Sequence, residues 1–107
     1  MTIYVDDMQR RARVGRLDGV WSHLMSDLPG EDGTAELVAF ARRLGLNPAW
    51  IQHRGRPIEH FDVTEPKRQQ ALRLGATPIH YGAEGARLTM AKREGVPFMA
   101  ARLDDRF

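Results

Sequence analysis

Five short segments of the chain are rich in β-branched and aromatic residues and stop at turn-forming residues. This pattern is typical of strands, and it predicts them at Thr2–Val5, Val20–Met25, Ala49–Gln52, Thr77–His80 and Val96–Ala101. Residues 8–19 are rich in arginine and contain two glycines, so we expect a basic loop there. His53–Pro57 is expected to form a second basic loop.

Three longer segments are predicted to form helices, and in the first of them Leu37, Phe40, Ala41 and Leu44 fall at helical spacing. They cover Ala35–Leu44, Glu65–Leu74 and Glu84–Glu94, and a glycine follows each of them. Glycine readily adopts the left-handed conformation that ends a helix. Thr34 and Thr64 stand at the expected N-caps of the first two helices.

The alternation of helix and strand predicts an α/β fold with a mostly parallel sheet of four or five strands, in two or three layers. A chain of 107 residues has room for one domain, which we expect to span residues 1–107. An all-α arrangement is the weaker alternative, because the apolar segments between the helices are short and β-branched.

Composition excludes several classes of protein. The chain is 42% hydrophobic and 28% charged, as is ordinary for a globular domain. No apolar run approaches the ~20 residues that cross a bilayer, and the N-terminus is acidic where a signal peptide needs basic residues. The chain has 0 cysteines, which excludes disulfides, thiol catalysis and thiolate zinc sites. We therefore expect a cytoplasmic protein without a membrane partner.

Charge is unevenly distributed, although 16 Lys and Arg nearly balance 14 Asp and Glu. Residues 18–41 are acidic and lack Lys and Arg, whereas residues 42–73 are basic and hold six Arg and one Lys. This segregation is compatible with an acidic site that faces a basic rim, as a metal ion and an anionic ligand would need. Neighbouring segments that neutralise each other in the fold would give the same pattern. The glycine-rich signatures of dinucleotide-binding and P-loop proteins are absent from the sequence.

Candidate metal ligands lie near the predicted ends of strands, where open α/β sheets bind ligands. Asp6 follows the first strand, His23 lies in the second, and Asp27 comes shortly after it. Carboxylate and imidazole groups bind divalent cations, and His23 is also a candidate acid or base. The alternatives are turn formation for the two acids and a buried, hydrogen-bonded imidazole for His23.

The stretch His60-Phe61-Asp62-Val63-Thr64 is the most suggestive. In extended backbone His60 and Asp62 point one way, while Phe61 and Val63 point the other way into the core. A His-x-Asp pair can ligate a metal ion through mixed donors or act as a base with its orienting carboxylate. We add Asp62 to the candidate metal ligands and His60 to the candidate catalytic groups, although such spacing also occurs by chance.

A candidate phosphate site lies at the start of the second predicted helix. Lys67 and Arg68 fall in its first turn, where cations oppose the helix dipole by ~0.3–1 kcal/mol. A bound phosphate would reverse that sign, so Thr64, Lys67 and Arg68 are candidate ligand-binding residues. Pairing with Glu59 and Glu65 on the surface is the alternative.

Several motifs together resemble a family of small bacterial and phage proteins known as domain of unknown function 4031. They are Tyr4-Val5-Asp6-Asp7, Trp21-Ser22-His23 with Asp27, Phe40-Ala41-x-x-Leu44-Gly45, His60-Phe61-Asp62-Val63-Thr64 with Lys67-Arg68, and Ala71-x-x-x-Gly75-Ala76. The resemblance implies no established activity or cofactor. It does imply that one motif set contains Asp6, His23, Asp27, His60, Asp62, Lys67 and Arg68.

These residues favour a metal-assisted enzyme that acts on a phosphate-containing substrate, either a nucleotide or a nucleic acid. A phosphoesterase or nuclease-like hydrolase with a divalent metal ion fits this description. The alternative is a non-catalytic module that binds nucleic acid or protein through its arginine-rich loops, of which Arg10–Arg16 is the larger. A structural or regulatory protein whose polar motif only organises loops is the third class.

Overall fold

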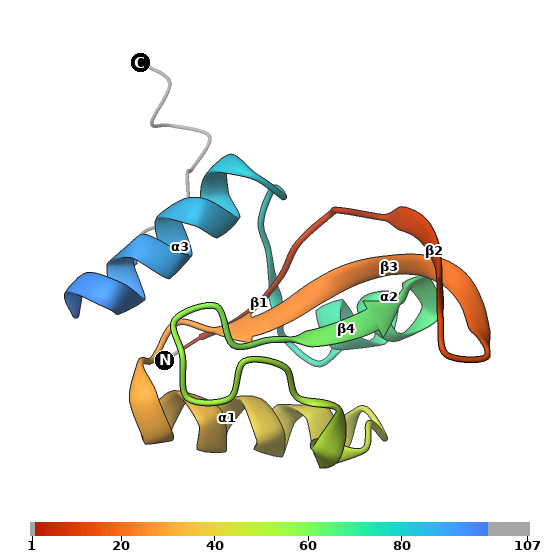
Figure 1. Cartoon of the computed structure of the whole chain (residues 1–107), viewed down its shortest axis with the longest axis horizontal. Coiled ribbons are helices and arrows are strands. Elements are labelled where there is room, and N and C mark those ends of the chain that lie inside the picture. The colour runs from red at the N-terminus through yellow and green to blue at the C-terminus, as the bar shows by residue number, and fades with distance from the viewer. Residues whose placement is uncertain (1, 99–107) are drawn as a thin grey trace.

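One long central strand organises the fold. β3 (Leu17–Ser26) pairs antiparallel with β2 (Arg10–Val14) and β1 (Ile3–Val5) along one edge. It pairs with β4 (Phe61–Thr64), also antiparallel, along the other edge. β5 (Thr77–Pro78) extends the sheet beyond β1 and is parallel to it. Figure 1 shows this arrangement in a computed structural model, which describes residues 2–98.

The sheet is therefore mixed, and the expectation of a mostly parallel sheet is wrong. The main reason is the arginine-rich stretch, which forms a hairpin in place of the expected loop. Gly15, with φ of +61°, opens the turn that reverses β2 into β3. Most side chains of β2 are exposed, so its sequence lacks the alternation of apolar and polar residues that marks a half-buried strand.

The three predicted helices are present. α2 (Glu65–Arg73) and α3 (Ala83–Glu94) begin and end within one residue of expectation. α1 (Gly30–Arg43) begins five residues earlier than Ala35, directly after Pro29. Its first turn holds Glu31 and Asp32, whose charges favour the helix N-terminus. Thr34 is consequently inside the helix and not at its N-cap.

Two predicted strands differ in the structure. Instead of a strand at Ala49–Gln52, a 3-10 turn, η1 (Pro48–Trp50), is capped by the Asn47 side chain, which accepts a hydrogen bond from Ala49 N at 2.9 Å. Gln52 alone forms a β-bridge, to His60. The expected strand at Val96–Ala101 is not formed by residues 96–98, and its remaining residues lie outside the described part of the chain.

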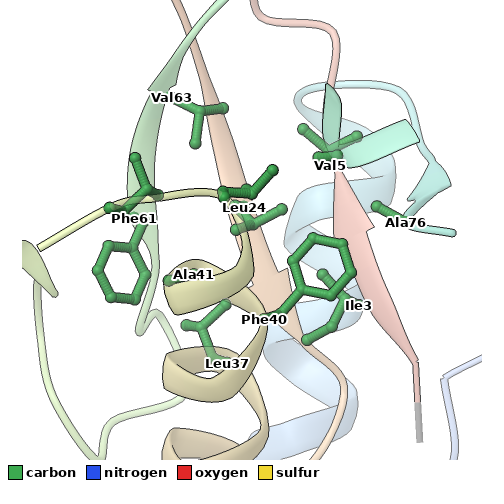
Figure 2. Close-up of a cluster of buried hydrophobic side chains, with 12 residues drawn as sticks. Ile3, Val5, Leu24, Leu37, Phe40, Ala41, Phe61, Val63 and Ala76 are labelled. Atoms are coloured by element: carbon green, nitrogen blue, oxygen red, sulfur yellow. The ribbon is translucent and has the colours of Figure 1, made fainter. Parts of the chain in front are cut away.

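Helices cover both faces of the sheet, which gives three layers and confirms the α/β class. α1 and α2 pack on what we call the core face, in a cluster that includes Ala71 of α2. Figure 2 shows Leu24, Leu37, Phe40, Phe61 and Val63 of this cluster. α3 packs on the opposite side, the α3 face, in a smaller cluster of Tyr4, Ile79, Leu88, Ala91 and Phe98. Within residues 2–98, every helix is too short or too polar to cross a membrane.

Alternate residues of the strands divide between these faces, as extended backbone requires. In β4, Phe61 and Val63 are each 1% exposed on the core face, whereas the residues between and after them are half-buried. In β3, Leu24 lies in the core cluster, while Met25 packs with the α3 cluster. The candidate site is built on the residues that point away from the main core.

Candidate functional site

Three side chains converge on the α3 face where β3 meets β4. His23 lies directly opposite Asp62 in the strand register, and His60 stands one residue before β4. One ligand atom from each of His23, His60 and Asp62 lies within 4.8 Å of the others. We call these three residues the His-His-Asp cluster. The sequence predicted that His60 and Asp62 share a face, and the antiparallel register adds His23.

Each imidazole of the cluster is held by a hydrogen bond at Nδ1. His23 Nδ1 lies 2.7 Å from Asp6 Oδ2, and His60 Nδ1 lies 2.8 Å from the carbonyl oxygen of Ile58. A carbonyl oxygen can only accept, so His60 Nδ1 carries the proton, and an ionised Asp6 requires the same of His23. Nε2 is therefore the nitrogen that each ring can offer to a ligand. Metal-binding histidines are commonly fixed in this way.

Asp62 is fixed as well. Its Oδ2 accepts a hydrogen bond from Gln52 Nε2, and its Oδ1 lies 3.4 Å from His60 Nε2. The hydrogen bond with His60 is the main reason that the pKa of Asp62 is lowered. Burial disfavours the charged form of His60, but the hydrogen bonds to Asp62 and Ile58 outweigh it and raise the pKa of His60. His60 and Asp62 therefore favour an ion pair that a bound cation would replace.

Asp6 stands behind His23 and is not among the three converging side chains. Its carboxyl group is 2% exposed. Besides the contact with the His23 ring, Asp6 Oδ1 accepts hydrogen bonds from the backbone N–H of His23 at 2.9 Å and of Met8 at 3.2 Å. Asp6 therefore orients His23, where the sequence analysis expected a direct metal ligand.

A bulge between β1 and β2 makes this arrangement possible. Val5 pairs with Leu24, so an uninterrupted strand would place Met8 opposite Trp21, but Arg10 occupies that position. Two residues are therefore looped out, and Gln9 adopts a φ of +47°. β-Bulges re-aim side chains in this manner and are frequent next to functional sites.

The residue after Asp6 points toward α3. Asp7 Oδ1 accepts a hydrogen bond from Tyr81 N at 2.7 Å, and Asp7 Oδ2 lies 2.9 Å from His80 Nδ1. These contacts hold the segment before α3 against the bulge. The ring of Tyr81 consequently stacks on His23, with centroids 5.7 Å apart and planes at 18°.

Asp27 is not brought to the cluster. It follows the far end of β3, four residues after His23, which corresponds to ~13 Å along a strand. Its Oδ1 accepts a hydrogen bond from Thr2 N at 2.9 Å. This contact ties the first residues of the chain to the end of β3.

The candidate phosphate ligands have partners within the chain. Lys67 Nζ donates to the carbonyl oxygen of Leu44 at 2.5 Å, at the C-terminal end of α1, where a cation is favourable. Arg68 Nε donates to the carbonyl oxygen of Asp6 at 2.8 Å, and its Nη1 lies 3.3 Å from Glu65 Oε2. Thr64 occupies the N-cap position of α2 but makes no side-chain capping bond. Arg68 thus supports the site from behind, through the backbone of Asp6.

A cavity of about 310 Å³ opens beside the cluster, between the sheet and α3. Its walls are formed by Asp6, His23, Met25, Pro57, Ile58, Glu59, His60, Tyr81, Gly82, Gly85, Ala86 and Thr89. The α3 wall, Gln52 and Ile58 were not predicted from the sequence as parts of the site. Their spacing relative to the cluster has no local signal, because loops and tertiary packing bring them there.

Comparison with known protein families gives one description for this arrangement of residues. A family model described as "Protein of unknown function (DUF4031)" matches residues 3–93, and this range includes every residue of the cluster and of the cavity. No curated protein and no solved structure matches the chain.

Proposed function

The chain belongs to the DUF4031 family, and we propose that it is a divalent-metal hydrolase whose ion is held by His23, His60 and Asp62. The observation that carries this proposal is that each of the three donors is fixed by its own partner. These partners are Asp6 for His23, the Ile58 carbonyl for His60 and Gln52 for Asp62. Such support is typical of metal centres and less expected of a surface cluster.

Three protein donors suit a catalytic metal centre, because positions remain open for water and substrate. Two imidazoles and one carboxylate are donors that Zn²⁺, Fe²⁺ and Mn²⁺ accept. A divalent ion bound there supplies an activated water near neutral pH and polarises a phosphoryl oxygen. Asp62 supplies the negative charge of the site, and Asp6 keeps the Nε2 lone pair of His23 available.

A phosphate ester is the substrate class that we propose. Arg10 pairs with Trp21, two residues from His23, and therefore shares the α3 face at ~7 Å along the strand. It is exposed and forms no ion pair within residues 2–98, so it is available to a phosphate group. Because Lys67 and Arg68 are engaged elsewhere, we place Arg10 ahead of them as the phosphate partner.

Calorimetric titration with Zn²⁺ and Mn²⁺ tests the proposed centre. We expect His60→Ala and Asp62→Ala to weaken binding at least tenfold relative to the unsubstituted chain. His80→Ala is the matched control, because it also removes an imidazole paired with a carboxylate, but an exposed one outside the cluster. Equal affinities in all four proteins would contradict the proposal.

Hydrolysis of p-nitrophenyl phosphate and bis(p-nitrophenyl) phosphate tests the activity. We expect turnover that a chelator abolishes and the added metal ion restores. The two substrates separate a phosphomonoesterase from a phosphodiesterase. Metal binding without turnover of either one would retain the centre and refute the hydrolase.

A second candidate function, nucleic-acid binding without catalysis, is favoured by the β2–β3 hairpin. It carries Arg10, Arg11, Arg13 and Arg16. Of these four arginines, only Arg13 has a carboxylate of the described residues within ion-pair distance, that of Asp18 at 3.9 Å. Binding of a labelled oligonucleotide, followed by fluorescence anisotropy, should then weaken steeply as salt is added and should not change when a chelator is added. Replacing Arg11 and Arg16 by alanine should reduce the salt slope; an unchanged slope would exclude the hairpin.

A further inference from the structure

We infer that the cavity beside the cluster receives an uncharged, apolar or aromatic part of the substrate, while the phosphate lies at the metal end. The position of the phosphate rests on the proposed function, whereas the character of the cavity does not. The substrate is then a phosphate ester with an apolar organic group, and not a free polyphosphate.

The surface of the cavity is largely apolar away from the cluster. Met25 contributes from β3, Pro57 and Ile58 from the loop before β4, and Ala86 from α3. Ile58 and Tyr81 are 43% and 48% exposed, which places large apolar side chains next to the opening of the cavity. A volume of about 310 Å³ is at the lower end for small-molecule sites.

The charges of the cavity exclude an anionic group from its interior. Among the described residues, no lysine or arginine lines the cavity. Its carboxylates already have partners: Asp6 is bound to His23, and Glu59 accepts hydrogen bonds from Gly55 N at 2.7 Å and from the Thr34 hydroxyl. Away from the imidazoles at the cluster end, a phosphate inside the cavity would meet the carboxylates of Asp6 and Glu59, so the group that enters the rest of the cavity is uncharged.

The polar groups of the α3 wall are also satisfied within the chain. The Thr89 hydroxyl donates to the carbonyl oxygen of Gly85 at 3.0 Å. Within residues 2–98, His23 Nε2 forms no hydrogen bond, so it is a polar atom that remains for a ligand at the cluster end of the cavity. A ligand with one anionic end and one apolar end matches this polarity.

Gly85 shows that the chain leaves this space open. It lies within α3 with ordinary helical backbone, and a Cβ added there would meet nothing within 4 Å. Neither backbone conformation nor a close neighbour therefore requires glycine, although glycine is disfavoured in helices relative to alanine. Because Gly85 lies on the cavity wall, its lack of a side chain leaves room for a ligand.

Two probes test the cavity in the Zn²⁺-loaded protein. Phenyl phosphate and methyl phosphate share the anionic group, but only phenyl phosphate has a ring to bury. We expect phenyl phosphate to bind at least tenfold more tightly. Gly85→Leu should remove this preference by filling the cavity, with the affinities for methyl phosphate and Zn²⁺ unchanged.

Ala83→Leu is the matched control, because it adds the same side chain to an exposed position of α3 outside the cavity lining. It should keep the preference for phenyl phosphate. Ala86→Met fills the cavity from the next residue of the wall and is measured alongside, in case Gly85→Leu folds poorly. Equal binding of the two probes by the unsubstituted chain, or an intact preference in both filled variants, would overturn the inference.

Phenol distinguishes failure of the cavity from failure of the metal centre, because it carries no phosphate. In amide NMR spectra of the metal-free protein, we expect phenol to shift the signals of Ala86 and Thr89, and Gly85→Leu to abolish the shifts. If Zn²⁺ and both phosphates fail to bind while phenol binds, the proposed function falls and the cavity stands. Absence of phenol binding overturns the inference about the cavity.

Discussion

The two faces of the sheet are made by the same strands yet differ in what they hold. The core face is apolar and lies against two helices, with Phe61 and Val63 each 1% exposed. The α3 face carries His60 and Asp62 on the alternate residues of the same segment, and it lies against one helix that leaves a cavity. A period of two thus lets one strand of four residues serve both stability and the candidate chemistry.

Substituting neighbours in β4 should separate the faces most strongly. Phe61→Ala removes a ring that is 1% exposed, and we expect it to lower the free energy of unfolding by ~3–5 kcal/mol. Asp62→Ala, one residue away, should change it by less than about 1 kcal/mol, because its pair with His60 is partly solvated. Urea denaturation in the presence of a chelator measures both. Comparable losses would show that the α3 face is also structural.

Asp6 links the two faces in function, since it is buried and yet serves His23. Asp6→Ala leaves the N–H groups of Met8 and His23 without their acceptor, which should cost ~1–3 kcal/mol of stability. Loss of the orienting carboxylate should also weaken Zn²⁺ binding ~10–100-fold. Asp27→Ala provides the control, because it also removes a carboxylate that accepts a backbone N–H, but at the far end of β3 from the cluster. Similar zinc affinities for the two variants would refute the orienting role.

Glycines in the helices of the two faces should respond in opposite directions. Gly85→Ala in α3 should raise the free energy of unfolding by ~0.5–1 kcal/mol, because the added Cβ has open space. Gly33→Ala in α1 should lower it, because a Cβ there would lie 1.9 Å from the carbonyl oxygen of Leu28. Thermal unfolding of the two variants gives the signs directly. A loss in both would mean that α3 has no spare room.

The smallest expected effect is the pH dependence of the metal-free α3 face. Although burial opposes it, the pKa of His60 is raised above its ordinary value of 6.5, mainly by Asp62. Because this pKa is raised in the folded state, His60 contributes its full stabilisation below pH 6.5. This contribution is lost as the pH rises through the pKa of His60 in the folded protein. We expect the free energy of unfolding to decrease from pH 6 to pH 8, and His60→Gln to flatten this change. Equal slopes in the two proteins would exclude the contribution of His60.

Asp62 sets the acid limit of the same window. Its hydrogen bond with His60 lowers its pKa below the ordinary value of 3.8. Its contribution is therefore present above pH 3.8 and is lost as the pH falls through the lower folded value. Asp62→Asn should accordingly be less sensitive to acid in this range when denaturation is followed at pH 5 and below.

Local patterns predicted the parts of the fold that local physics determines. The apolar stripe of α1 and the glycines after the helices gave three helices nearly in place. The sheet was predicted incorrectly because β2 has exposed arginines on both faces and no alternating pattern to detect. The predicted start of α1 was too late, because Thr34 resembles an N-cap residue in the sequence. In the structure its hydroxyl instead donates to Glu59 and to the Gly30 carbonyl oxygen inside the fold.

The candidate site was predictable as far as strand geometry reaches. The alternation in β4 placed His60 and Asp62 on one face, whereas the pairing of His23 with Asp62 depends on an antiparallel register that the sequence does not state. Asp6 was expected as a ligand because the bulge that turns it toward His23 leaves no local signal. Lys67 was predicted to bind phosphate at the start of its own helix, whereas its long side chain reaches the carbonyl oxygen of Leu44 at the end of α1.

The outer side of β2 has a consequence for the protein at high concentration. Within residues 2–98, β2 pairs with β3 alone, so no described strand covers the backbone groups on its other side, as is characteristic of an edge strand. Its arginines would bring like charges together in any pair with the same strand of another molecule and should keep separate molecules apart. This repulsion acts over a Debye length of ~10 Å at 0.1 M salt and ~3 Å at 1 M. Colloidal stability should therefore decline as salt is added, and light scattering across that range should show an increase in particle size, because salt screens the exposed Arg11 and Arg13.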